Sequence, residues 1–259
     1  MAQFLPRNVQ SGVASRADTG LLDVGLRAHM LRVYNYLAGG IGLAAIIAYA
    51  LFSMSVTTDP ALAVATFGGK KLTAFGAAFF GSPLYLVVSF APLVMLIGLM
   101  FVGQRLGVFG TQVAYWLLVT LIGASLSAVF MRYKLGSAAQ VFAITSVAFA
   151  SLSLWGYTTK RDLSGFGTFL MMGLIGIILA SLLNLWFQSG AMQFAISCIG
   201  VLVFAGLTAY DTQRIKDEYL MIAGDTVEVA KAAVWGALSL FLDFVNLFQF
   251  LLSLLGNRD

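Results

Sequence analysis

An aspartate stands inside the last apolar block of this sequence, where an ionisable side chain is costly. Asp243 lies about eleven residues, or roughly 16 Å of helix, into a block from Ala232 to Leu255. An aspartate at the centre of a membrane helix costs about 3 kcal/mol, so it should face protein or water and have a partner. Ser239, Asp243 and Asn246 recur at i, i+4 and i+7 and form one polar stripe. We therefore predict that Ser239 and Asn246 line an interior path that contains Asp243.

A second acid and a base stand at the ends of other apolar blocks. Asp211 directly follows the sixth block, and Arg105 ends the second. If these two residues and Asp243 converge, they form a pH-responsive cluster, because neighbouring charges alter one another's protonation. Two carboxylates would also offer a weak calcium site, since hard cations prefer oxygen ligands. The alternative for Asp211 is a solvated helix end paired only with Arg214, and the sequence leaves open whether the two aspartates meet.

Other kinds of chemistry find little support in these residues. The chain has one histidine and one cysteine, so no zinc cluster or internal disulfide is expected, and no cofactor is implied. An intramembrane aspartyl protease is an alternative, because two aspartates on successive helices can share a proton. Such proteases resemble one another in a Gly-x-Gly-Asp signature, whereas Leu-Phe-Leu precedes Asp243 here. Serine and metal hydrolase signatures are also absent from the sequence. We therefore predict that the protein is not an enzyme.

Membrane helices must position these residues. Hydrophobic residues make up 60% of the 259 residues and charged residues only 10%, where soluble domains carry roughly 25%. The sequence predicts an all-α polytopic membrane protein with seven transmembrane helices, because each apolar block can cross a bilayer. The blocks run approximately over 33–54, 84–103, 109–131, 138–157, 165–187, 191–210 and 232–255. Residues 1–28 would form a cytoplasmic tail and residues 29–259 the membrane domain.

The loop charges predict a cytoplasmic N-terminus and an external C-terminus. With that orientation ten lysines and arginines lie inside and five outside, as the positive-inside rule requires. The inner set is Arg7, Arg16, Arg27, Arg32, Arg105, Lys160, Arg161, Arg214, Lys216 and Lys231, and the outer set is Lys70, Lys71, Arg132, Lys134 and Arg258. We expect the protein to lie in a bacterial inner membrane and to have no cleaved signal peptide. The net charge of +4 is scattered between apolar blocks, so no nucleic acid partner is expected.

Small residues at four-residue spacing predict where helices pack closely. Gly40, Ala44 and Ala48 follow this spacing in the first span, and Gly176 and Ala180 follow it in the fifth. Such residues allow helix backbones to approach one another.

Two connections carry local signals. Residues 55–83 form a long connection that would be an interfacial or re-entrant segment. Asp225 followed by Glu228 is a capping pattern, which predicts that the last helix begins there.

Two segments resemble the paired signatures of a known family. They are Phe204–Gln213 (FAGLTAYDTQ) and Ala237–Phe248 (ALSLFLDFVNLF). They are similar to those of the Bax inhibitor family, to which the bacterial YccA and YetJ proteins belong. The resemblance covers about residue 25 to the C-terminus. The chain departs from the family in a longer connection between the first two spans and in an extended loop before the last span.

The resemblance implies a central seventh helix surrounded by six others and a pH-dependent calcium leak. It also implies that Asp211 and Asp243 match two acidic sensor positions and that Arg105 matches a basic latch. The branch represented by YccA is associated with modulating a membrane-bound protease. A regulator that binds a membrane protease or another membrane protein is therefore the alternative function.

Overall fold

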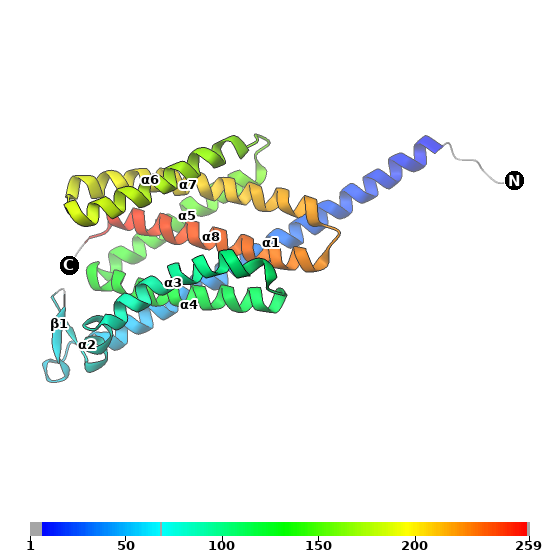
Figure 1. The fold of residues 1–259 in the computed structure, drawn as a ribbon. Coiled ribbons are helices and arrows are strands. Elements are labelled where there is room, and N and C mark those ends of the chain that lie inside the picture. The colour runs from blue at the N-terminus through cyan, green and yellow to red at the C-terminus, as the bar shows by residue number, and fades with distance from the viewer. Residues whose placement is uncertain (1–6, 68, 258–259) are drawn as a thin grey trace.

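The computed structural model describes the backbone of residues 7–67 and 69–257 and the side chains of residues 23–67 and 69–257. Within these residues the chain is almost entirely helical (Figure 1). The helices are α1 (Arg7–Ser55), α2 (Ala74–Phe80), α3 (Pro83–Val102), α4 (Val108–Arg132), α5 (Leu135–Thr158), α6 (Ser164–Phe187), α7 (Gly190–Ile222) and α8 (Thr226–Leu255). The shorter elements are η1 (Pro60–Leu62), β1 (Ala65–Phe67), β2 (Lys70–Leu72) and η2 (Gly103–Arg105).

The prediction of seven membrane-spanning helices is confirmed. All the α-helices except α2 are long and apolar enough to cross a bilayer. The sixth span is longer than its apolar block, because α7 continues from Gly190 to Ile222. Hydropathy falls near Tyr210, but the backbone hydrogen bonds of a helix continue until its sequence interrupts them. Asp211 therefore lies inside a continuous helix and not at its end.

The predicted N-terminal tail is continuous with the first span. Helix α1 begins at Arg7, and within the residues whose side chains are described its stretch Asp23–Ser55 is long and apolar enough to cross a membrane. Residues 1–6 of the predicted tail, and Arg258 of the predicted outer set, lie outside the described residues.

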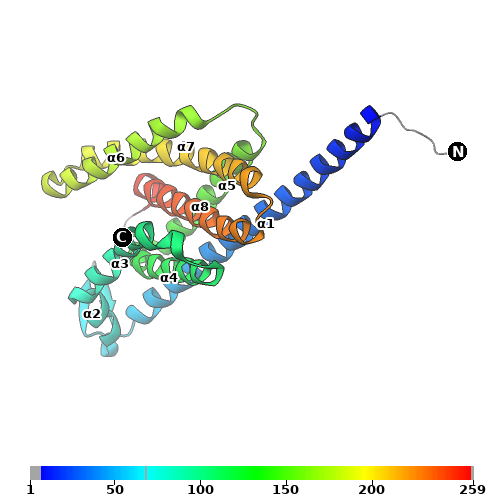
Figure 2. The same cartoon turned by 45° about the vertical axis from the view of Figure 1, so that its right-hand side comes forward.

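Helix α8 is the central helix, as expected for the seventh span. Figures 1 and 2 show it between α6 and α7 on one side and α3 and α4 on the other. Half of its most apolar stretch is buried inside the bundle, compared with 39% for α4, the next most buried. Its residues Ala237, Leu240 and Phe241 are fully buried. An ionisable group on this helix is therefore removed from lipid by its neighbours.

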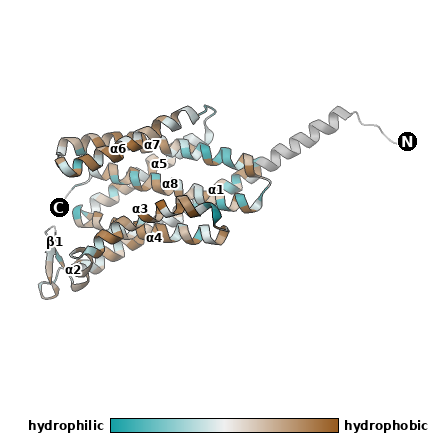
Figure 3. Ribbon diagram, viewed as in Figure 1, coloured by the Kyte–Doolittle hydropathy of each residue, from teal (hydrophilic) through white to brown (hydrophobic). Residues whose placement is uncertain are grey.

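The outer surface of the bundle is apolar, as a lipid-facing surface must be. Trp186, Met100 and Phe109 are 91%, 79% and 78% exposed. Figure 3 shows hydrophobic residues along much of α3, α4 and α6. Patches of this size on a soluble monomer would be unusual.

The predicted start of the last helix is confirmed. The side chain of Asp225 accepts hydrogen bonds from the backbone N–H groups of Val227 (2.9 Å) and Glu228 (3.1 Å). Glu228 in turn forms an ion pair with Lys231 at 3.0 Å. These bonds satisfy donors that the first turn of a helix otherwise leaves unpaired.

The long connection between α1 and α3 folds at the end of the bundle (Figure 1). Strands β1 and β2 pair antiparallel with Thr66 opposite Lys71. Helix α2 has seven residues, about 10 Å, which is too short to enter the bilayer far. Its Phe79 and Phe80 pack with Leu72 and Met131. Whether this connection is interfacial or re-entrant stays a prediction.

Close helix contacts occur at some of the predicted small residues and not at others. A side chain at Gly123 of α4 would collide with the backbone of Ala44, so α1 and α4 touch there as predicted. No atom lies near the corresponding position of Gly176. Another close contact occurs at Gly156 of α5, where an added side chain would collide with the backbone of Ala209 on α7, two residues before Asp211.

Gly156→Ala should therefore destabilise the protein, whereas Gly176→Ala should not. Forcing an extra methyl group against backbone typically costs about 1–3 kcal/mol. At Gly176 the methyl group meets no atom, and alanine favours a helix over glycine by about 1 kcal/mol. The thermal unfolding temperature of both variants in the same detergent measures this difference. Equal temperatures would mean that α5 and α7 are not in close contact at Gly156.

Candidate functional site

Helices α7 and α8 bring the two predicted aspartates together. A side-chain hydrogen bond joins Asp211 and Asp243, which are 8% and 5% exposed. Two carboxyl groups form a hydrogen bond only if one of them carries a proton, because an ionised carboxylate has no donor. Such a pair can therefore share one proton while it carries one negative charge.

Arg214 supplies the positive charge that balances this pair. Its guanidinium lies 3.2 Å from Oδ1 of Asp211 and donates a hydrogen bond of 3.1 Å to the hydroxyl of Ser239 on α8. It also lies over the ring of Tyr210, 5.9 Å from the ring centre. Arg214 thus connects α7 to α8 beside the acids. The pairing of Asp211 with Arg214 and its contact with Asp243 occur together, although the sequence presented them as alternatives.

One carboxyl oxygen of the pair is buried without a protein donor. Oδ2 of Asp243 accepts no hydrogen bond from the described part of the chain. Leaving a buried polar atom unsatisfied costs about 1–3 kcal/mol. This oxygen is therefore the atom of the pair best placed to bind a proton, a water molecule or a cation.

Arg105 does not join the aspartates. It is exposed at the end of η2, and among the described residues no ion pair connects it to Asp211 or Asp243. The neighbouring Gly103 lies against the ring of Trp235 on α8. Trp235 precedes Asp243 by eight residues, or about 12 Å of helix. The expected contact of Arg105 with the acids is not formed here, and Arg214 takes that place because it lies one turn from Asp211 on the same helix.

The polar stripe on α8 divides between two neighbourhoods. Ser239 belongs to the acid pair through Arg214. Asn246 donates a hydrogen bond of 2.8 Å to the carbonyl of Leu242 and lines a cavity of about 330 Å³ beside α6. Phe204 and Phe250 line the same cavity. The stripe therefore begins at the aspartates and ends against two aromatic rings.

Polar side chains resume beyond these rings, toward the other end of α7 and α8. The hydroxyl of Ser197 lies 3.0 Å from that of Ser253, and Gln193 donates to Ser197 at 3.4 Å. With Asn184 and Gln188, the side chains of Gln193 and Ser253 line a second cavity of about 360 Å³. The contact between α7 and α8 thus carries polar groups in two separate regions.

An aromatic pair separates the two polar regions. The rings of Phe204 and Phe250 stack at 5.7 Å between centres. Phe250 also lies directly on Gly200, where any side chain would collide with its ring. This stretch carries no charged side chain, so an ion would meet apolar atoms here.

Several buried polar residues near the acids were not predicted from the sequence. The hydroxyl of Thr212 lies 2.9 Å from that of Ser153 on α5, which in turn lies 2.8 Å from the hydroxyl of Tyr34 on α1. Gln213 donates to the carbonyl of Arg161 at 2.9 Å and so holds the loop before α6. The run of polar residues after Tyr210 could have indicated these contacts. Four consecutive residues of a helix point in different directions, so some of these polar side chains must face neighbouring helices.

The predicted calcium ligands remain two in number. The described residues contain no group of three or more acidic, histidine or cysteine side chains able to hold a metal ion. Calcium usually takes six to eight oxygen ligands. Asp211 and Asp243 would therefore contact a passing ion only with help from neutral oxygens or water.

Residues 26–259 match the family described as Bax1-I, inhibitor of apoptosis-promoting Bax1. An uncharacterized protein of Caulobacter vibrioides is 47% identical to this chain over 247 residues, which are 95% of each protein. The inner membrane protein YbhL of Escherichia coli strain K12 is 40% identical over 236 residues, which cover 90% of this chain and 93% of YbhL. A Rickettsia prowazekii protein is 38% identical over 236 residues, covering 91% and 92%. The family match includes both signature segments.

Proposed function

This chain belongs to the Bax inhibitor family, and we propose that it is a pH-sensitive calcium leak channel without enzymatic activity. The observation that carries the proposal is the hydrogen-bonded pair of Asp211 and Asp243, buried between two membrane helices with Arg214 at 3.2 Å. Ionisable groups inside a membrane protein are rare and mark ion or proton pathways. Calcium is the transported substrate, and no resident cofactor is required.

The route proposed for the ion follows the contact between α7 and α8. Oxygen-bearing side chains stand in two separate regions of this contact, and oxygen is the ligand that calcium prefers. The proton shared by the aspartates holds the two helices together in the closed state. Loss of this proton leaves two adjacent negative charges, which repel one another and favour separation of α7 from α8.

Phe204 and Phe250 close this route between its polar ends. Apolar constrictions block ions because they exclude the water that an ion needs. Phe250→Ala should therefore raise calcium flux into proteoliposomes several-fold at a pH where the wild type conducts little. Phe169→Ala removes the same ring from the lipid-facing surface of α6, where Phe169 is 67% exposed, and should leave the flux unchanged.

The same experiment tests the function. Wild-type flux that changes with pH, together with a leakier Phe250→Ala variant, supports the proposal. Absence of calcium flux in both proteins at every pH would reject it. Co-purification of a membrane protease without flux would favour the alternative, a regulator that binds a membrane protease or another membrane protein.

A paired set of aspartates is also the catalytic device of aspartyl proteases. Their two carboxyl groups must reach a water molecule and the peptide bond. Here Asp211 forms an ion pair with Arg214, and Asp243 is almost fully buried. These contacts support a role as a proton-sensitive closure, and we propose that the chain cleaves no peptide bond.

We propose an inner membrane location with the N-terminus in the cytoplasm and the C-terminus outside. The relative YbhL is named an inner membrane protein. The described charges agree with the orientation, because Lys160, Arg161, Lys216 and Lys231 lie at one end of the bundle. A reporter enzyme fused after Gly224, in the turn between α7 and α8, should be active on the cytoplasmic side. One fused at the C-terminus should be active outside, and the reverse pattern would overturn the orientation.

A further inference from the structure

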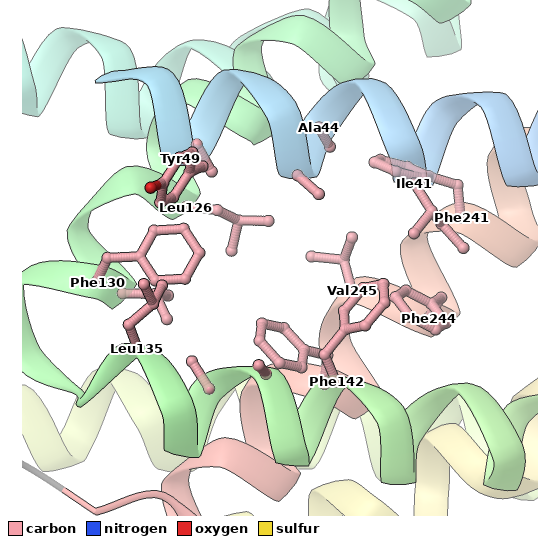
Figure 4. Close-up of a pocket in the computed structure, with 16 residues that line it drawn as sticks. Ile41, Ala44, Tyr49, Leu126, Phe130, Leu135, Phe142, Phe241, Phe244 and Val245 are labelled. Atoms are coloured by element: carbon pink, nitrogen blue, oxygen red, sulfur yellow. The ribbon is translucent and has the colours of Figure 1, made fainter. Parts of the chain in front are cut away.

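An apolar cavity lies between α1, α4, α5 and α8, away from the aspartates (Figure 4). Its volume is about 260 Å³. Ala44 and Ala48 of α1 form one wall, Ala138 of α5 a second, and Phe244 and Phe248 of α8 its inner side. The lining exposes almost only carbon, and the hydroxyl of Tyr49 is at its edge.

Small side chains on facing helices create this space. Ala44 packs against Gly123 of α4 on one side, but its other side faces the cavity. Ala138 and Ala139 of α5 are too short to fill the distance to α1. The cavity is open on one side, between α1 and α5, where the lining residues Ala45 and Ala139 are exposed and the two helices make little contact. It therefore opens toward the surrounding lipid.

Only an apolar occupant suits this cavity. A buried water molecule needs two to four polar partners, and this lining offers almost none. An engineered apolar cavity of about 150 Å³ already stays dry and takes up apolar molecules. In a bilayer the abundant apolar species is an acyl chain.

The turn between α4 and α5 places positive charge beside the opening. Arg132 and Lys134 are both exposed and lie in sequence between two lining residues, Phe130 and Leu135. Charged side chains at this end of the described bundle are Lys70, Lys71, Arg132, Lys134 and Asp59. The positive charge of Arg132 and Lys134 complements a phosphate group at the membrane surface.

We propose that this cavity binds one acyl chain of an anionic glycerophospholipid, with the phosphate held by Arg132 and Lys134. The acyl chain enters between α1 and α5 and contacts α8 at Phe244 and Phe248. Because α8 is covered by the other helices, bulk lipid does not reach these two residues. The lipid would thus become part of the packing around the central helix.

Photo-crosslinking of wild-type protein tests the site directly. The protein is placed in phosphatidylcholine nanodiscs containing a trace of phosphatidylglycerol with a diazirine on one acyl chain. Crosslinked peptides should include Phe244–Phe248 of α8, and excess unlabelled phosphatidylglycerol should reduce this labelling several-fold more than extra phosphatidylcholine. An unlabelled α8, or equal competition by the two lipids, would overturn the proposal.

Matched variants separate the head group from the chain. The double variant Arg132→Gln, Lys134→Gln should lose most labelling of α8. The double variant Lys160→Gln, Arg161→Gln removes the same charge at the opposite end of the bundle and should retain the labelling of α8. Unchanged labelling in the first variant would reject the phosphate contact.

The cavity itself is tested by filling it. Ala139→Phe places a ring in the cavity and should abolish the labelling of α8. Ala195→Phe adds the same ring to an exposed position on α7 and should leave the labelling of α8 unchanged. Full labelling of a folded Ala139→Phe protein would place the chain elsewhere, and the charge variants decide the proposal if this variant does not fold. All these readouts are independent of calcium flux.

Discussion

Asp243→Asn is expected to remove most of the pH dependence of calcium flux. In the wild type the bond between Asp243 and Asp211 exists only while the pair holds its proton. A hydrogen bond to a charged group contributes about 1.5–3 kcal/mol, so losing that proton should shift the closed population about tenfold or more. The amide of asparagine can donate to Asp211 at every pH. The variant should therefore stay closed above the pH at which the wild type opens.

The direction of the pH response follows from the protonation state in which Asp211 and Asp243 can form their hydrogen bond. Below the titration of the pair the proton is present and the helices are joined; above it the bond is lost. The proton belongs to the pair as a whole, so the flux should change in steps that belong to neither residue alone. Asp211→Asn should also alter the profile, because it removes the charge that Arg214 balances.

Calcium flux into proteoliposomes, measured over pH for each protein, decides between these outcomes. Asp217→Asn is the matched control. Asp217 is an exposed acid on α7, the helix of Asp211, and its substitution should leave the pH profile unchanged. If Asp243→Asn and Asp211→Asn both reproduce the wild-type profile, the acids are structural and the proposed sensor is wrong.

Arg214→Gln is expected to raise the resting flux, and Arg105→Gln to change it little. Arg214 lies 3.2 Å from Asp211 and binds Ser239, so its loss removes both the balancing charge and a link between α7 and α8. The arginine side chain is 47% exposed, so solvent screens the pair and we assign it about 1 kcal/mol. That free energy corresponds to about a fivefold change in the closed population.

The two arginine variants carry the same charge change and differ in position. Arg105 is exposed and has no ion pair with either aspartate among the described residues. Flux at one fixed pH, normalised to the amount of reconstituted protein, separates them. A leak produced by Arg105→Gln but not by Arg214→Gln would return the latch to the α3–α4 connection and remove it from α7.

The amino-acid sequence was sufficient to predict the membrane helices. A chain in lipid must satisfy its backbone hydrogen bonds internally, so each long apolar block becomes a helix regardless of its neighbours. The cap at Asp225 was predictable for a similar reason, because its bonds to Val227 and Glu228 are local. The cost of burying a charge also indicated that Asp243 would have a partner.

Only the tertiary structure decided which partner that is. Asp211 and Asp243 are 32 residues apart, and their contact depends on how far α7 continues and how α7 and α8 are rotated about their axes. The same rotation brings Arg214 to the pair, whereas Arg105 is exposed on the connection between α3 and α4. Small residues could be recognised in the sequence, but whether they adjoin a backbone, as at Gly156, or a cavity, as at Ala48, depends on the helix that lies opposite. Hydropathy and local hydrogen bonding act within one helix, whereas the site and the cavity arise from relative positions of several.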